Sequence, residues 1–365
     1  MGLFNKKKTN TPNENNKRDF TPNPPTCDNN PKDYGFDENL KNAIDAIIPV
    51  ISNGDLNLIP SVYNAEILTK SVNDASISDI LTLAGYTQKF AQNDQKGDQS
   101  FAPTFLNILA GGIGLKIKSA NTLYSVFSSA LKKPYPLIAF GYATIFFTES
   151  DAKAWAEKYQ NEHESEVFVK TFSGDEIKEY FELLTALGIL TICPEPHASQ
   201  LVMHHQPIFE TTFETVSHPS LQFFSIRFVQ VLRSKILQAQ ANQAHGAVLS
   251  SILSSEFLCP GKTINGKFIV ASMQQPESSI ILAFTDKREL ELVKEDNKTI
   301  GEFLEAAEVR TLSFKDLEEF LMAPKVEAFC INLAGTGFMV KREVYENLYK
   351  AIKENPDKNV TIKVE

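Results

Sequence analysis

The sequence has few cysteines, and they show no pattern. Four cysteines are spread over 365 residues, at positions 27, 193, 259 and 330. A disulfide framework in a small secreted protein uses closely and regularly spaced cysteines, so this spacing argues against one. Widely separated free thiols are typical of a reducing compartment, and we therefore expect a cytoplasmic protein.

Positive charge is also scarce. The chain holds 36 Lys and Arg against 45 Asp and Glu, which gives a net charge of −9 at pH 7. Nucleic-acid backbones are bound by clustered Lys and Arg side chains. This balance argues against nucleic acid as the main partner, and leaves proteins as the expected partners, of unknown identity.

Long hydrophobic runs are absent. The uncharged segment Phe101–Leu115 comes nearest to one, but a membrane-spanning helix needs about 20 apolar residues. We expect no transmembrane segment. We interpret Phe101–Leu115 as a buried helix with a glycine break, and the alternative is a hydrophobic element that inserts into a partner.

Two glycine-containing segments suggest phosphate-binding loops, and both fail the pattern. Gly111–Gly114 would need another glycine where Ile117 stands to form a dinucleotide-binding G-x-G-x-x-G motif. Gly261–Thr263 would need a glycine where Glu256 stands to complete a P-loop. We therefore expect no nucleotide cofactor.

A cysteine and three histidines lie close together in the sequence: Cys193, His197, His204 and His205. Consecutive residues of a strand point to opposite faces, so His204 and His205 cannot easily join one tetrahedral metal site. The sequence near Cys193 and His197 shows no third group that would orient a thiol–imidazole pair. We expect no metal, no cofactor and no catalytic residue, and keep the turn of Cys193 and His197 as the alternative place for a ligand or metal.

The feature that the chain does have is an internal duplication. Residues 145–203 and 281–341 share the order strand, capped helix, strand, helix, strand, strand. Residues 145–151 match 281–287, and residues 169–181 match 309–321. Four pairs have the three-residue spacing of a helix capping box: Thr148 with Asp151, Ser173 with Glu176, Asp286 with Glu289, and Ser313 with Asp316. Each copy is expected to bury one helical face against a sheet.

The second copy resembles the N-terminal domain of the SseB (enhanced serine sensitivity) family over roughly residues 245–350. The match is carried by the strand segments 268–273, 282–286, 309–314 and 329–335, with the Phe-Thr turn of the family at positions 284 and 285. Asn332 fits the family's Asn-containing turn, but Leu333 stands where a proline often follows; in the first copy Pro194 is present and Cys193 stands where the Asn would be. The resemblance implies a small α/β binding or regulatory module without an established catalytic activity.

These observations predict an α/β (α+β) protein with two tandem SseB-like modules, mixed sheets and a helical N-terminal region. Helices are expected over Thr122–Leu131 and Leu221–Leu237, one before each copy of the duplicated segment. The predicted parts are a disordered tail (1–36), a mostly helical region (37–118), module 1 (119–215), a helical linker (216–257) and module 2 (258–365).

The N-terminal tail is expected to be disordered because it is rich in Pro and Asn and poor in hydrophobic residues. Its first eight residues, Met1–Lys8, suggest a lipidated basic anchor. The myristoylation pattern wants Ser or Thr where Lys6 stands, however. A solvated tail is the main expectation, and peripheral proximity to a membrane stays open.

From the sequence we expect a non-enzymatic protein-binding adaptor or accessory subunit of a larger cytoplasmic assembly, of which a secretion-related assembly is one version. The alternative is a small-ligand-binding regulator or an enzyme that uses a cleft between the two modules. The residues expected at exposed, functionally shaped turns are Asn332, Gly335, Gly337, Cys193 and His197.

Overall fold

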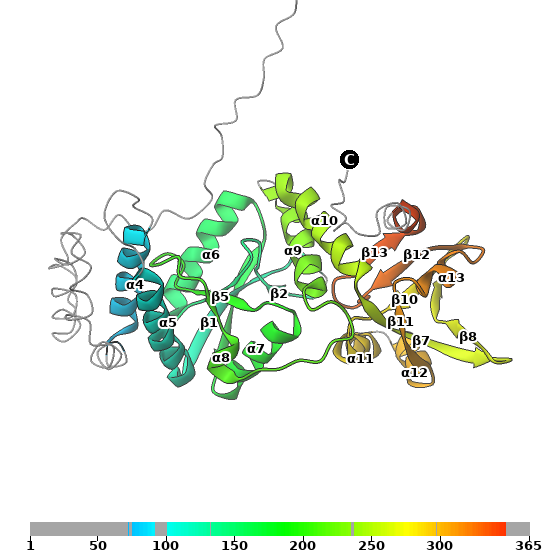
Figure 1. Ribbon diagram of the computed structural model, residues 1–365, viewed down its shortest axis with the longest axis horizontal. Coiled ribbons are helices and arrows are strands. Elements are labelled where there is room, and N and C mark those ends of the chain that lie inside the picture. Colours follow the sequence, from blue (N-terminus) through cyan, green and yellow to red (C-terminus); the bar gives the residue numbers. More distant parts are fainter. Residues whose placement is uncertain are drawn as a thin grey trace, which may run out of the picture.

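The computed structural model describes Val72 and residues 75–91, 101–131, 133–234, 237–296 and 298–347. It shows helices combined with several mixed and antiparallel sheets, which confirms the predicted α/β class. Figure 1 shows an elongated molecule in which the first described helices lie at one end and the elements of the C-terminal third lie at the other. The predicted tail (1–36) lies outside the described residues.

Module 1 contains two three-stranded sheets with the strand orders β2-β1-β4 and β3-β5-β6. Strands β3 and β5 are parallel, and the other neighbours are antiparallel. The elements are β1 (Thr122–Ser128), β2 (Tyr135–Pro136), β3 (Ala143–Ile145), α6 (Glu149–His163), β4 (Val167–Ser173), α7 (Asp175–Ala186), β5 (Thr191–Pro194), β6 (Met203–His204) and α8 (Gln206–Phe209).

Module 2 repeats this plan with the strand orders β11-β7-β8 and β13-β12-β10-β9, and β10 is parallel to β12. The elements are β7 (Glu256–Ile264), β8 (Lys267–Val270), β9 (Ser272–Gln274), β10 (Ser279–Ala283), α11 (Lys287–Asp296), α12 (Lys298–Glu305), β11 (Glu308–Ser313), α13 (Leu317–Leu321), β12 (Val326–Ile331) and β13 (Phe338–Lys341).

The strand pairings show which residues of the two copies are equivalent. Tyr124 pairs with Thr171 as Leu258 pairs with Thr311, so the predicted match of 169–181 with 309–321 has the correct register. The same two residues form isolated bridges, Tyr124 to Phe146 and Leu258 to Phe284. Phe146 is therefore equivalent to Phe284.

The register predicted for the first strand of the duplication is wrong by two residues. It placed Ile145 opposite Ile281, whereas the equivalence of Phe146 and Phe284 places Ile145 opposite Ala283. Both strands are buried at every position, so no alternation of polar and apolar side chains marks the register.

A helix pair precedes each module: α4 (Ile77–Ala91) and α5 (Phe101–Ser119) before module 1, and α9 (Leu221–Arg233) and α10 (Ala241–Leu253) before module 2. A short 3-10 turn, Leu237–Gln240, joins α9 to α10. The second helix of each pair contributes fully buried side chains to the core of its own module, such as Ile113 and Ile117 of α5 and Val248 and Ile252 of α10. The repeated unit is thus a helix pair followed by an α/β module.

Two helix predictions for the segments between residues 101 and 131 need correction. The segment Thr122–Leu131 contains strand β1 (Thr122–Ser128) and no helix. Helix α5 runs through Gly111, Gly112 and Gly114 without a break. A Cβ atom at Gly112 would lie 2.3 Å from Cγ1 of Val72, so the missing side chain allows close packing there.

Helix α9 bridges the two modules, as the sequence predicted for this segment. Its Ile226 lies in the core of module 1, and its Leu221 lies in the core of module 2. The Gln230 amide accepts a hydrogen bond from the Ile138 N–H at 2.8 Å and donates one to the Pro136 carbonyl at 2.8 Å. The strand β7 begins at Glu256, so the helical segment ends inside the predicted range 216–257.

Candidate functional site

Each module places a polar turn at the carboxyl ends of its two adjacent parallel strands. In module 2 this turn begins at Asn332, whose N–H donates to the Ala283 carbonyl at 2.9 Å. In module 1 the equivalent residue is Glu195, whose N–H donates to the Ile145 carbonyl at 2.8 Å. Ligands of α/β sheets bind outside the carboxyl ends of the strands, so these two turns are the places where a site is expected.

The two turn residues share an unusual backbone conformation and the same contact. Glu195 has φ of 45° and Asn332 has φ of 56°, both in the left-handed region. The Asn332 Oδ1 accepts a hydrogen bond from the Thr285 N–H at 3.0 Å, and the Glu195 Oε1 accepts one from the Phe147 N–H at 2.6 Å. The side chain thus satisfies the first free N–H after the neighbouring parallel strand in both copies.

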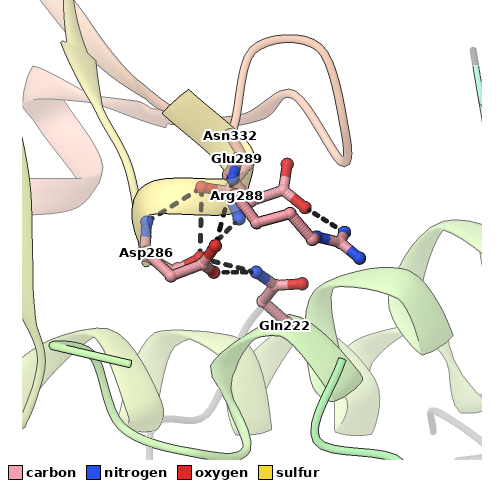
Figure 2. A network of polar contacts seen from close by, with 6 residues as sticks. Gln222, Asp286, Arg288, Glu289 and Asn332 are labelled. Carbon is pink, nitrogen blue, oxygen red and sulfur yellow. Dashed lines mark hydrogen bonds and ion pairs between the residues drawn. The ribbon is translucent and has the colours of Figure 1, made fainter. Parts of the chain in front are cut away.

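In module 2 the turn belongs to a closed polar network. The Thr285 hydroxyl donates to Asp286 Oδ2 at 2.7 Å and accepts from the amides of Asn332 and Gln222 at 2.9 and 2.6 Å. Gln222 reaches this site from α9, and Figure 2 shows its amide pointing to Asp286. Every hydrogen-bonding position of the Thr285 hydroxyl is used, so this hydroxyl holds the turn together and is not free to bind a ligand.

Glu289 lies beside this network and is fully buried. Its Oε1 accepts a hydrogen bond from Arg288 at 2.7 Å, whereas its Oε2 has no hydrogen-bond partner among the described residues. Burial raises the pKa of Glu289, and the nearby Asp286 charge acts in the same direction, while the charges of Arg288 and Lys133 oppose it.

Gly335 allows module 1 to reach this carboxyl group. A Cβ atom at Gly335 would lie 2.4 Å from Glu289 Oε2 and 2.5 Å from the Tyr135 hydroxyl oxygen. Tyr135 comes from β2 of module 1, so the two modules meet here. Burial, followed by the charge of Glu289, raises the pKa of Tyr135. Gly335 therefore has a packing role.

The free energy of unfolding of the variant Glu289→Gln, relative to that of the wild type, is expected to increase as the pH rises. The folded-state pKa of Glu289 lies above its unfolded value, so its stabilising protonated form is complete below the unfolded pKa and is lost as pH rises through the folded one. The amide does not titrate. Urea unfolding of both proteins between about pH 5 and pH 8 measures the difference.

Glu295→Gln is the matched control, because it is the same substitution at an exposed position of the same helix. Its difference from the wild type should stay flat over this range. If the stability of Glu289→Gln relative to the wild type instead increased as the pH falls, the prediction would be contradicted, because Arg288 would then hold Glu289 ionised.

In module 1 the equivalent turn is open. Glu195 is buried, Asp151 is half-buried, and His197 lies on the rim of the turn with its side chain 45% exposed. The imidazole stacks on the ring of Phe146 at an interplanar angle of 5°. One ligand atom from each of Asp151, Glu195 and His197 lies within 4.8 Å of the other two. This arrangement can hold a cation or exchange protons with solvent.

Burial disfavours the charged forms of both Glu195 and His197 in this turn. Burial raises the pKa of Glu195 to about 7, with Asp151 adding to the effect and the Phe147 N–H opposing it. Burial also lowers the pKa of His197, although the charge of Asp151 opposes this shift. Near neutral pH, neither group is firmly held in its charged form.

The structure corrects the expectation that five turn residues are exposed. Only His197 is well exposed; Asn332, Gly335 and Cys193 are buried, and Gly337 is half-buried. Gly337 has φ of +56°, a backbone conformation that glycine adopts without strain. Three of the five therefore present no side chain to a partner.

Cys193 is neither a reactive thiol nor the equivalent of Asn332. It lies inside strand β5, where Thr144 pairs with it as Leu282 pairs with Cys330 in module 2. Its thiol is fully buried and contacts the Ser199 carbonyl at 3.7 Å. Burial raises the pKa of Cys193 to about 12, which keeps the thiol protonated and poorly nucleophilic.

The two consecutive histidines point to different environments, as the sequence predicted. His204 is exposed, whereas His205 is fully buried with its Nε2 at 2.6 Å from the Ile189 carbonyl oxygen. They do not form one site with His197.

Sequence reasoning missed Glu195 and assigned Asp151 only a capping role. The capping role is correct, because the Asp151 N–H donates to the Thr148 hydroxyl at 3.2 Å. With the register corrected, Thr148 is equivalent to Asp286 and Asp151 to Glu289. Aligning Glu195-Pro196-His197 with Asn332-Leu333-Ala334 would have revealed the acidic residue and the histidine that only module 1 carries.

No protein-family model, curated protein or solved structure matches this chain. Within the part that the structure describes, no helix is long and apolar enough to cross a membrane.

Proposed function

We propose that the protein is a non-enzymatic adaptor or accessory subunit that binds another protein in a cytoplasmic assembly, with a secretion-related assembly as one version. The observation that carries the proposal is an exposed apolar sheet face on module 2. We call it the hairpin face, and it consists of the residues Ile264, Ile269, Val309 and Phe303, which are 51%, 52%, 40% and 38% exposed.

The strand register places these side chains on one side of the sheet. Ile269 pairs with Lys262, and Val309 pairs with Pro260. Because side chains alternate along β7, Lys262, Pro260 and Ile264 share a face. Lys262 also lies 5.4 Å from the ring of Phe303, which brings α12 to the same side. The apolar groups therefore form one surface.

Helices α11 and α12 cover the inner part of this side of the sheet and leave the outer part open. Leu258 of β7 is buried in a cluster with Leu290 of α11 and Leu304 of α12. The hairpin of β7 and β8 continues beyond α12, and Figure 1 shows it projecting from the end of the molecule. Contiguous exposed apolar surface of this kind is typical of protein interaction sites.

The opposite face of the same hairpin is polar and internally paired. Arg310 lies over the ring of Phe268 at 4.4 Å and donates a hydrogen bond to Glu308 at 2.6 Å. Thr263 donates to Glu308 at 2.7 Å. These contacts stiffen the hairpin, which favours presentation of the apolar face in a fixed shape.

The non-enzymatic part of the proposal is supported by the buried, protonated thiol of Cys193 and by the closed network of module 2. We also propose that the chain is related to the SseB family, on the resemblance of short strand and turn segments over roughly residues 245–350.

The alternative, a small-ligand-binding regulator, is favoured by one pocket. This pocket of about 770 Å³ lies between α5 and the segment that follows β5. Its lining combines Leu106, Leu115 and Val202 with Asn107 and His204. Helix α9 packs between the two modules, where the sequence predicted a cleft. In the alternative function, the pocket beside α5 is therefore the proposed ligand site.

Affinity capture from native cells tests the adaptor proposal. The double variant Ile264→Ser with Ile269→Ser should reduce recovery of a stoichiometric protein partner by about tenfold or more, because contacts at the centre of an interface dominate its affinity. Crosslinking and quantitative mass spectrometry measure the recovery. Thermal unfolding checks that the variant is folded.

The matched control applies the same kind of change at Leu115 and Val202, which are 50% and 44% exposed near the pocket. Leu115→Ser with Val202→Ser should retain the partner. The adaptor proposal fails if the wild type recovers no stoichiometric partner, or if both double variants recover it equally. Loss only in the control would favour a site at the pocket.

A further inference from the structure

One buried polar atom in module 1 has no explanation in the fold. The Glu195 side chain is 7% exposed, and its Oε2 has no hydrogen-bond partner among the described residues. Leaving a buried polar atom unpaired costs about 1–3 kcal/mol, so such an atom usually has a ligand, a water or a functional role. The atom faces His197, whose Nδ1 lies 3.4 Å away.

The distances fit a small metal ion. Zinc binds nitrogen and carboxylate oxygen at about 2.0–2.2 Å, so two ligand atoms of a tetrahedral site are about 3.4 Å apart. The separation of Glu195 Oε2 and His197 Nδ1 is 3.4 Å. The Asp151 carboxylate completes a set of three ligand atoms, all within 4.8 Å of one another. Small side-chain rotations would bring the third atom to the same distance.

Both carboxylates are held in place by neighbours that leave ligand capacity free. The Phe147 N–H donates to Glu195 Oε1, so Oε2 is left to point at His197. The Thr148 hydroxyl donates to Asp151 Oδ2 at 2.5 Å. Hydrogen bonds of this kind orient metal ligands, and their loss typically costs about 10–100-fold in metal affinity.

Module 2 lacks this arrangement at the equivalent positions. Asn332 replaces Glu195, Ala334 replaces His197, and Gln222 closes the network. The side-chain amide of Asn332 is therefore enough to accept the hydrogen bond that holds this turn. The second carboxylate and the histidine in module 1 are additions that the fold does not require.

We propose that Asp151, Glu195 and His197 bind one divalent transition-metal ion, best matched by zinc, and that solvent completes its coordination. An imidazole nitrogen with only three protein ligands favours zinc over calcium or magnesium, which prefer six or more oxygen ligands. Two carboxylates neutralise the charge of the ion.

Zinc binding to the tag-free full-length chain tests the proposal. Cys27, which lies outside the described residues, is replaced by serine in all samples to remove a competing thiol. Zinc sulfate is titrated in competition with a chromophoric zinc chelator, and the thermal unfolding temperature is followed with and without zinc. We expect one zinc per chain and a rise in the unfolding temperature, because the ligand binds the folded state.

The variants Glu195→Gln and His197→Ala should each weaken zinc binding by about tenfold or more. Glu195→Gln keeps an oxygen acceptor for the Phe147 N–H, and His197 is half-exposed, so at least the latter variant is expected to fold. His204→Ala is the control, because His204 is an exposed histidine of the same module. Unchanged affinity in both variants, or an equal loss in His204→Ala, would overturn the proposal.

Discussion

Replacing Asn332 with alanine is expected to lower the free energy of unfolding by about 3 kcal/mol. The change leaves the buried Thr285 N–H without its acceptor and removes the amide that donates to the Thr285 hydroxyl. An unpaired buried group costs about 1–3 kcal/mol, and a non-glycine residue without a polar side chain at φ of 56° adds about 1 kcal/mol. Urea unfolding followed by circular dichroism measures the loss.

Two further variants separate the two contributions. Asn332→Gly removes the same hydrogen bonds but relieves the backbone, so it should be about 1 kcal/mol less damaging than alanine. Asn265→Ala changes an exposed Asn with φ of 51° that lies in the turn between β7 and β8, so it should show only the backbone cost. If Asn332→Gly were as stable as the wild type, the buried network would contribute nothing measurable.

Local folding signals were the part of the structure that the sequence predicted well. The capping pairs are formed in both copies: the Ser173 N–H donates to Glu176 and the Ser313 N–H donates to Asp316, each at 3.0 Å. Such contacts join residues three positions apart, so their spacing is visible in the sequence. The duplication was recognised because these signals occur twice.

Strand assignment failed where burial hides the alternation of side chains. Strand β1 is buried at four consecutive positions, 125–128, so the period of two that marks a half-buried strand is missing. An apolar run of this kind is also compatible with a helix, which was the prediction for Thr122–Leu131. The opposite case is Asn265-Gly266, a strong hairpin-turn signal that does join β7 to β8.

The site was predicted only in part, because its contacts depend on residues far apart in the chain. Gln222 reaches Thr285 and Asp286 across more than 60 positions. Glu195 acquires its role from a left-handed backbone that no residue pattern marks, since Glu rarely adopts it. Only His197, which the sequence singled out, proved to be on the open rim of the turn.

The second large effect is expected at Gly188. This residue follows the end of α7 and packs against Pro219, which lies just before α9. Gly188 follows the helix end with φ of +69°, its N–H donates to the Thr185 carbonyl, and the next N–H, of Ile189, donates to the Leu184 carbonyl. This is a Schellman helix ending, which requires the left-handed conformation. A Cβ atom at Gly188 would also lie 2.3 Å from the Pro219 carbonyl oxygen.

Gly188→Ala should therefore lower the free energy of unfolding by about 3 kcal/mol, about 1 kcal/mol from the backbone and the rest from the forced movement of Pro219. Gly266→Ala is the control, because Gly266 has φ of +76° in the turn between β7 and β8 but no atom within 4 Å of an added Cβ. It should lose only about 1 kcal/mol. Equal losses in urea unfolding would show that the contact with Pro219 yields freely, and that module 1 is not held firmly against the chain entering α9.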